Sequence, residues 1–269
     1  MVDHLRQCTK VEALCRPAVT GVGAPSPGPP AIPLPSLQRL EWCCSLSLDR
    51  LGGIHSLEDV LLQCPNLRYL FLTGTWEAFP LSQTSVNMPK LETLRLGRLS
   101  PGFIDRMLGS EWSLPALKTI ILDQAPTSYV QQPVPTLFWN KFGKNVTRVE
   151  LGKESWFSED NCISVCLAGC PALQELSYHP FYIYHRTWRK ETHRSLRCLR
   201  LHASADEAND EEELWDMLLG HLYTFNHRGM KRLSNMVLHG DWTRFMNDAQ
   251  WGYVEDIVEE QGREIDLEM

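Results

Sequence analysis

Three regularly spaced cysteines form a set of potential metal ligands. Cys162, Cys166 and Cys170 recur every four residues, which places their thiols on one face of a helix. Three thiolates on one face could hold a metal ion, but structural zinc sites usually pair cysteines across a turn and take a second pair from elsewhere. Free cysteine also packs as a small apolar residue. We therefore interpret this face as core packing and keep a metal site as the alternative.

Three histidines occupy the same position behind three predicted strands. His179, His202 and His239 each stand directly after an apolar strand segment. If these strands are neighbours in a parallel sheet, their backbones lie roughly 5 Å apart. Polar residues at the ends of exposed strands are the simpler interpretation. The alternative is a ladder that binds a metal or responds to pH, because imidazole titrates near neutrality.

The sequence contains no motif that arranges catalytic groups. It has no Gly-x-Ser-x-Gly elbow, no glycine-rich phosphate loop followed by Lys-Ser/Thr, and no His-Glu-x-x-His. We therefore expect a protein that is not an enzyme and that takes no cofactor and no metal. A catalytic site assembled from residues far apart in the sequence is the alternative.

The composition argues against several further classes. The 269 residues are 43% hydrophobic and 22% charged with a net charge of -7, as in ordinary soluble proteins. Negative charge argues against nucleic-acid and membrane-surface partners, and no apolar run reaches the ~18 residues of a membrane helix. Nine cysteines without an export signal favour reduced thiols. We expect a cytoplasmic or nuclear protein.

The elements that would position these residues follow one recurring apolar pattern. The pattern is Leu-x-x-Leu-x-Leu with conservative exchanges, and its copies begin 23 to 37 residues apart, 28 on average. Its last two apolar positions lie on one face of a strand. The copies are Leu37/Leu40/Trp42, Leu67/Leu70/Leu72, Leu91/Leu94/Leu96, Leu117/Ile120/Leu122, Val146/Val149/Leu151, Leu173/Leu176/Tyr178, Leu196/Leu199/Leu201 and Leu233/Met236/Leu238, with Val11/Leu14 as a degenerate first copy.

Amphipathic segments between these strands predict helices over 56–62, 103–108, 158–168 and 210–227. Six acids within residues 206–213 suit the positive end of the last helix, and a docking patch for a basic partner is the alternative. One strand and one helix per copy is the geometry of a leucine-rich repeat, whose units stack into a solenoid. The expected fold class is α/β: an irregular leucine-rich-repeat solenoid with a parallel concave sheet and helices and loops on the convex side.

A family resemblance rests on the phrases LPSLQRLEW, CPNLRYLFLTG, MPKLETLRLG, LPALKTIIL and CPALQELSYHP. They resemble the repeat region of fungal F-box/leucine-rich-repeat-like proteins. The resemblance implies that the repeats select a target for a cullin–RING ubiquitin ligase, whose adaptor binds the F-box. The first 35 residues contain no F-box-like helical run. We expect the repeat region alone, with the ligase adaptor as a partner only if an F-box is supplied upstream.

The expected organisation has two parts. Residues 1–240 form the solenoid, and residues 241–269 form a capping helix over 250–262 and a frayed acidic tail. Residues 17–35 contain seven prolines and three glycines, which predict a solvent loop. A polyproline II ligand is the alternative there.

The partner surface is expected on the concave face, where the residues beside the middle apolar position point. Aromatic residues and arginine dominate binding hot spots. We therefore expect a protein or peptide to bind through Tyr69, Phe71, Arg95, Ile121, Arg148 and Arg200. The alternatives are a loop of the chain covering this face, an acidic peptide or phosphopeptide on the basic stretch 185–200, and a stand-alone scaffold or truncated product without a ubiquitin-ligase role.

Overall fold

The computed structural model describes residues 13–16, 34–44, 57–74, 85–99, 101–123, 134–152, 162–183, 191–203, 211–225, 229–260 and 262–268. These residues form an α/β protein built on parallel sheet. The chain divides into two compact units. Unit 1 comprises Met1–Leu122 and Pro126–Phe142, and unit 2 comprises Asp123–Ala125 and Gly143–Met269.

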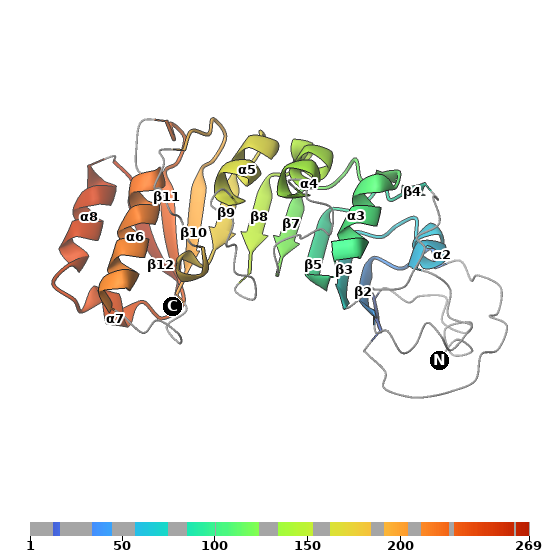
Figure 1. Cartoon of the computed structure of the whole chain (residues 1–269), viewed down its shortest axis with the longest axis horizontal. Coiled ribbons are helices and arrows are strands. Elements are labelled where there is room, and N and C mark those ends of the chain that lie inside the picture. The colour runs from blue at the N-terminus through green and yellow to red at the C-terminus, as the bar shows by residue number, and fades with distance from the viewer. Residues whose placement is uncertain are drawn as a thin grey trace. The chain divides into compact units, whose positions relative to one another are not determined.

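Unit 1 is a parallel sheet with its helices along one side (Figure 1). Its strands, in spatial order, are β1 (Ala13–Arg16), β2 (Arg39–Cys44), β3 (Tyr69–Gly74), β5 (Thr93–Leu99) and β7 (Thr119–Leu122). Its helices are α2 (Leu57–Leu62), α3 (Pro101–Gly109) and α4 (Val134–Phe142). The short strands β4 (Val86–Asn87) and β6 (Trp112–Ser113) form a separate parallel pair.

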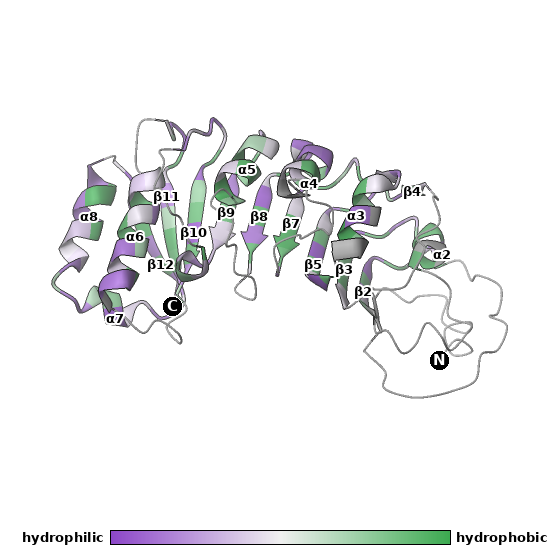
Figure 2. Ribbon diagram, in the orientation of Figure 1, coloured by the Kyte–Doolittle hydropathy of each residue, from purple (hydrophilic) through white to green (hydrophobic). Residues whose placement is uncertain are grey.

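Unit 2 repeats this arrangement. Its parallel strands, in spatial order, are β8 (Arg148–Leu151), β9 (Glu175–Tyr178), β10 (Cys198–His202), β11 (Asn235–His239) and β12 (Glu264–Glu268). Its helices are α5 (Cys162–Gly169), α6 (Glu211–Phe225), α7 (Thr243–Met246) and α8 (Trp251–Glu259), with 3-10 turns η2 (Gly143–Asn145) and η3 (Pro180–Tyr182). Hydrophobic and hydrophilic residues both occur along α6 and α8 (Figure 2), as expected for helices with one buried side.

The apolar pattern builds the core of both units. Every residue of its eight complete copies is at most 4% exposed. Within each unit, equivalent positions are paired in register, as Leu40 with Leu70 and Leu199 with Met236. Within each unit, each copy therefore buries its strand against the next, as the sequence predicts. The degenerate first copy also forms a strand, with Leu14 paired to Leu40.

A tight turn precedes most of the strands. The first apolar residue of a copy donates its N–H to the carbonyl three residues earlier, for example Leu67 to Cys64 and Leu173 to Cys170. One copy uses a side chain instead: Leu196 N–H donates to Nδ1 of His193 at 3.0 Å. His193 thus replaces the backbone carbonyl that closes the turn elsewhere.

The C-terminal segment departs from the expected frayed tail. After α8, residues Glu264–Glu268 form β12 and pair in parallel with β11. The alternation of acids with Ile265 and Leu267 is typical of a strand with one solvated face. The segment therefore forms a strand, although its acidic composition suggested a frayed tail. The helix α4 is a further element that the apolar pattern does not predict. Residues 17–33 of the proline-rich loop and residues 185–190 of the basic stretch lie outside the described residues.

Candidate functional site

Two aromatic side chains on the open face of unit 1 each contact an arginine. By open face we mean the side of each sheet to which residues between the buried strand positions point. The guanidinium carbon of Arg39 lies 4.0 Å from the ring centre of Tyr69, and that of Arg95 lies 4.9 Å from the ring centre of Phe71. Glu41 accepts hydrogen bonds from Arg39 Nε at 2.8 Å and Nη2 at 2.5 Å. Cation–π contacts and this paired hydrogen bond hold the group in one arrangement.

Gly97 provides the space into which the Phe71 ring extends. A Cβ placed at Gly97 would lie 3.1 Å from Cε2 of Phe71 and 2.7 Å from Oγ1 of Thr73. The ring therefore packs directly against the glycine backbone, with a guanidinium near its centre. Ile121 on β7 pairs with Arg95 on β5, so it adds an apolar side chain beside this group. The result is a preorganised apolar and cationic surface.

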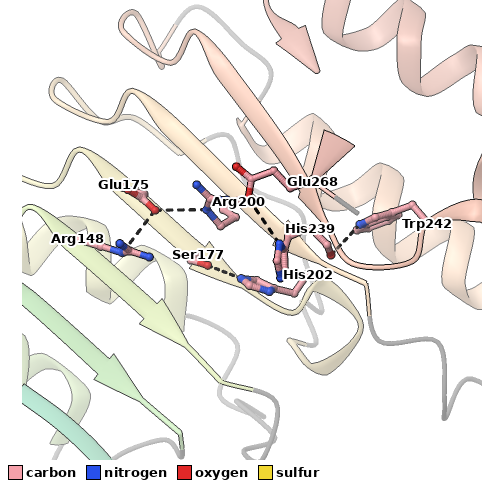
Figure 3. Close-up of polar contacts among 8 residues, drawn as sticks. All are labelled: Arg148, Glu175, Ser177, Arg200, His202, His239, Trp242 and Glu268. Atoms are coloured by element: carbon pink, nitrogen blue, oxygen red, sulfur yellow. Dashed lines mark hydrogen bonds and ion pairs between the residues drawn. The ribbon is translucent and has the colours of Figure 1, made fainter. Parts of the chain in front are cut away.

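Ion pairs cross the open face of unit 2 (Figure 3). Oε1 of Glu175 lies 3.5 Å from Nε of Arg148 and 3.4 Å from Nε of Arg200. Arg200 also binds the carboxylate of Glu268, and Nδ1 of His239 lies 3.6 Å from the same carboxylate. Burial alone would lower the pKa of Arg200, but Glu268 and Glu175 raise it above its usual value. One guanidinium on β10 thus connects β9 with β12.

Two residues of this open face are buried. Ser177 is 1% exposed and Val237 is 4% exposed. Nε2 of His202 lies 2.6 Å from Oγ of Ser177. Val237 lies on β11, between the strands that Arg200 and Glu268 connect. The sequence predicts that both point away from the core. Both are nevertheless buried, and Ser177 shares its hydrogen bond with the ring of His202 there.

The three histidines that follow the last apolar strands come together as the sequence predicts. The ring centre of His202 is 4.8 Å from that of His179 and 4.8 Å from that of His239. The planes of His179 and His202 differ by 29°, a stacked arrangement, whereas His239 meets His202 at 66°. The ring centre of Tyr182 lies 6.0 Å from that of His179, with the two planes at 85°. We call His179, His202 and His239 the histidine stack.

The middle position in the stack changes the acid–base chemistry of His202. Burial, with smaller contributions from His239 and Arg200, lowers the pKa of this imidazole from 6.5 to about 4. The ring is therefore neutral at neutral pH. A neutral imidazole has one donor and one acceptor nitrogen, so it can share a single hydrogen bond with the hydroxyl of Ser177.

A buried histidine fixes the turn that carries Tyr182. Nε2 of His221 lies 3.0 Å from the carbonyl oxygen of Pro180, and Nδ1 lies 3.1 Å from Oη of Tyr178. Since a carbonyl can only accept, Nε2 carries the proton and Nδ1 accepts from the tyrosine hydroxyl. Burial raises the pKa of Tyr178 well above its usual value, which keeps that hydroxyl protonated. His221 on α6 therefore anchors η3.

The cysteine face of α5 packs into the core of unit 2. Cys166 and Cys170 are fully buried and Cys162 is 9% exposed. Burial raises the pKa of Cys166 well above its usual value, and Cys170 adds to the shift, so this thiol stays protonated. Within the described ranges, no group of three or more His, Cys, Asp or Glu side chains could hold a metal ion. This observation covers both the cysteines and the histidine stack.

The six predicted partner-binding residues fall into two groups. Tyr69, Phe71, Arg95 and Ile121 share the open face of unit 1, whereas Arg148 and Arg200 share Glu175 in unit 2. Sequence reasoning missed Glu268, Gly97 and His221 as parts of these groups. The Glu-Ile-Asp-Leu-Glu alternation could have identified the strand that carries Glu268. A single sequence holds no signal that pairs Gly97 with Phe71, since their contact depends on strand register.

Comparison with known proteins yields no relative: no family model, curated protein or solved structure matches the chain. Within the described part of the chain, no helix combines the length and apolar character needed to cross a membrane.

Proposed function

We propose that this protein is a non-catalytic recognition module that binds a protein or peptide on its open face. The finer architecture that we propose is an irregular leucine-rich-repeat solenoid, in which the open face is the concave one. The regular burial of the apolar pattern and the in-register pairing of its copies within each unit support this architecture, because such units bury their edges only against neighbours.

The aromatic–arginine group of unit 1 carries the proposal. Tyr69 and Phe71 are half-buried on a sheet face where solvated strands usually present polar residues. Arg39 and Arg95 hold these rings in place, so little side-chain entropy is lost when a partner covers them. Aromatic and arginine side chains that are fixed before binding are typical of hot spots.

The ubiquitin-ligase connection is the second step of the proposal. By resemblance, the open face would select the target, and an F-box supplied upstream would bind the ligase adaptor. A stand-alone repeat scaffold would use the same open face without an adaptor. The two roles therefore share a surface and differ only in the machinery that accompanies it.

A quantitative affinity purification tests the binding surface. The full chain and the double variant Tyr69→Ser/Phe71→Ser are compared by mass spectrometry of bound proteins. We expect the double variant to retain at most about a tenth of the bound partner, in line with the loss of two hot-spot residues. Tyr253→Ser is the matched control, because Tyr253 is 64% exposed on α8. An unchanged partner signal in a folded double variant would refute the surface.

Two further readouts complete this experiment. Melting temperature separates loss of binding from loss of folding, since a covered pair of aromatic rings would destabilise the protein when removed. Recovery of an adaptor together with a cullin supports the ligase role. Recovery of a partner that depends on Tyr69 and Phe71, without adaptor or cullin, supports the stand-alone scaffold.

A further inference from the structure

The histidine stack lies at the carboxyl ends of three neighbouring strands of unit 2. His202 and His239 are the last residues of β10 and β11, and they are paired in register. His179 follows directly after the last residue of β9. Stacked rings therefore join the carboxyl ends of these three strands.

The backbone of His239 connects this stack to three further elements. Its carbonyl accepts the N–H of Ala203 at 2.8 Å, just after β10. The same carbonyl accepts Nε1–H of Trp242 at 3.2 Å, at the start of α7. The next residue, Gly240, has φ of +96° and donates its N–H to the carbonyl of Glu268 at 3.0 Å. A displacement of His239 consequently releases contacts to β10, α7 and β12 together.

Charged and titratable groups lie along the open face of unit 2 beside this stack, and one more lies on η3. They are Arg148 and Glu150 on β8, Glu175 on β9, Cys198 and Arg200 on β10, Asp266 and Glu268 on β12, and Tyr182 on η3. A proton on His239 lies beside the Glu268 carboxylate, which Arg200 shares. A proton on His202 instead adds positive charge next to the His239 ring and near Arg200.

We propose that the histidine stack is a proton-operated latch on the β10–β12 edge of unit 2. Neutral rings pack against one another and hold the ends of β10 and β11 together, and β12 with them. A proton on His202 is accommodated only when the rings separate, because separation exposes the imidazole to water and distances it from the neighbouring positive charges. Mild acid therefore opens this edge.

Proton linkage sets the size of the effect. The pKa of His202 is about 4 with the stack closed and 6.5 for an ordinary imidazole. The open state binds more protons over this range, so its population rises as the pH falls. Between about pH 7.5 and about pH 5.5, linkage through His202 predicts about a tenfold increase in the opening equilibrium.

Residue-resolved hydrogen exchange on the full chain tests the latch. The reporters are the amides of Ala203 and Gly240, which bond across the latch. The internal controls are the amides of Cys198 and Asn235, which bond to Gln174 and Arg197 at the opposite ends of the same strands. After correction for intrinsic exchange, we expect the reporters to open about tenfold more at pH 5.5 than at pH 7.5. The controls should change far less.

Two variants isolate His202. His202→Phe keeps an aromatic ring but removes the titrating group, so the reporters should lose most of their pH response. His55→Gln removes a histidine of unit 1 and should leave the response intact. Because the phenylalanine variant can fail to fold, NMR titration of the wild-type histidine rings is a second measurement. It should show His202 titrating well below 6.5.

The outcomes are distinct. Reporter amides that stay unchanged between the two pH values, or a His202 ring that titrates like a free imidazole, overturn the latch. Equal acceleration of reporters and controls also overturns it, since that pattern indicates global unfolding. A pH response that survives in folded His202→Phe assigns the effect to another group and also overturns the latch.

Discussion

Arg200 on β10 binds Glu268 on β12, two strands away, with its side chain passing over β11. The same guanidinium contacts Glu175 on β9. Arg200 thereby ties the last strand of the sheet to two strands that lie further inside unit 2. Val237, on the intervening strand β11, is 4% exposed.

Replacing Arg200 should therefore loosen β12. We expect Arg200→Met to lower the free energy of unfolding by about 1 kcal/mol, the upper range for partly exposed ion pairs. A double-mutant cycle with Glu268→Gln, measured by urea unfolding, isolates the pair. Added salt should reduce the coupling energy by screening. A coupling energy of zero at low salt would contradict a stabilising role.

Lys141 on α4 should stabilise the end of α3. Its ammonium donates to the carbonyls of Met107, Leu108 and Ser110 at 2.9, 2.8 and 2.5 Å, and burial lowers the pKa of this amine. A cation at a helix C-terminus satisfies carbonyls that have no partner within the helix. Lys141→Met should cost about 1–3 kcal/mol of unfolding free energy. The exposed Lys144→Met is the control and should have little effect.

His193 should make stability fall in mild acid. Its Nδ1 accepts the N–H groups of Leu196 and Ser195, and its Nε2 lies 3.1 Å from the carbonyl oxygen of Cys170. Burial lowers the pKa of His193 below 6.5, partly opposed by the Cys170 carbonyl. The unfolded chain then binds more protons than the folded chain below about pH 6.5. Stability is full above that pH and is lost as the pH falls toward the lower, folded-state pKa.

The variant His193→Asn checks this pH dependence. An asparagine amide offers one acceptor and donors but no titrating group. We expect a lower denaturation midpoint than wild type at pH 7.5 and a smaller loss between pH 7.5 and pH 5.5. If the loss on acidification equals that of the wild type, His193 is not a source of the effect.

Gly97→Ala should disturb the binding face of unit 1. The added methyl would lie 2.7 Å from Oγ1 of Thr73 and 3.1 Å from the Phe71 ring, so one of these side chains must shift. Such overpacking costs about 1–3 kcal/mol, and displacement of Phe71 should weaken partner binding. Gly252→Ala is the matched control, since it meets nothing within 4 Å. Because Gly252 lies in α8, that change should stabilise the protein by up to about 1 kcal/mol. Wild-type stability and binding in Gly97→Ala would refute the close packing.

The repeated apolar pattern specifies the strands that carry it and the core that they bury, but not β12. The spacing Leu-x-x-Leu-x-Leu selects one buried face per strand, and the periodicity of an extended chain leaves no other face for those residues. The same regularity placed Tyr69, Phe71 and the histidine stack on the open side. Their positions follow from counting along a strand, which needs no knowledge of distant contacts.

Contacts between strands far apart in the sequence set which of those side chains act together. Arg200 and Glu268 are 68 residues apart, and their contact requires β12 to pair with β11 in one register. The low pKa of His202 likewise depends on its burial and on His239 and Arg200 nearby. These features come from the fold around His202 and not from the residue type. Charge interactions and desolvation are set by distances in space. A sequence pattern specifies the face on which a side chain lies, but only the fold specifies its neighbours.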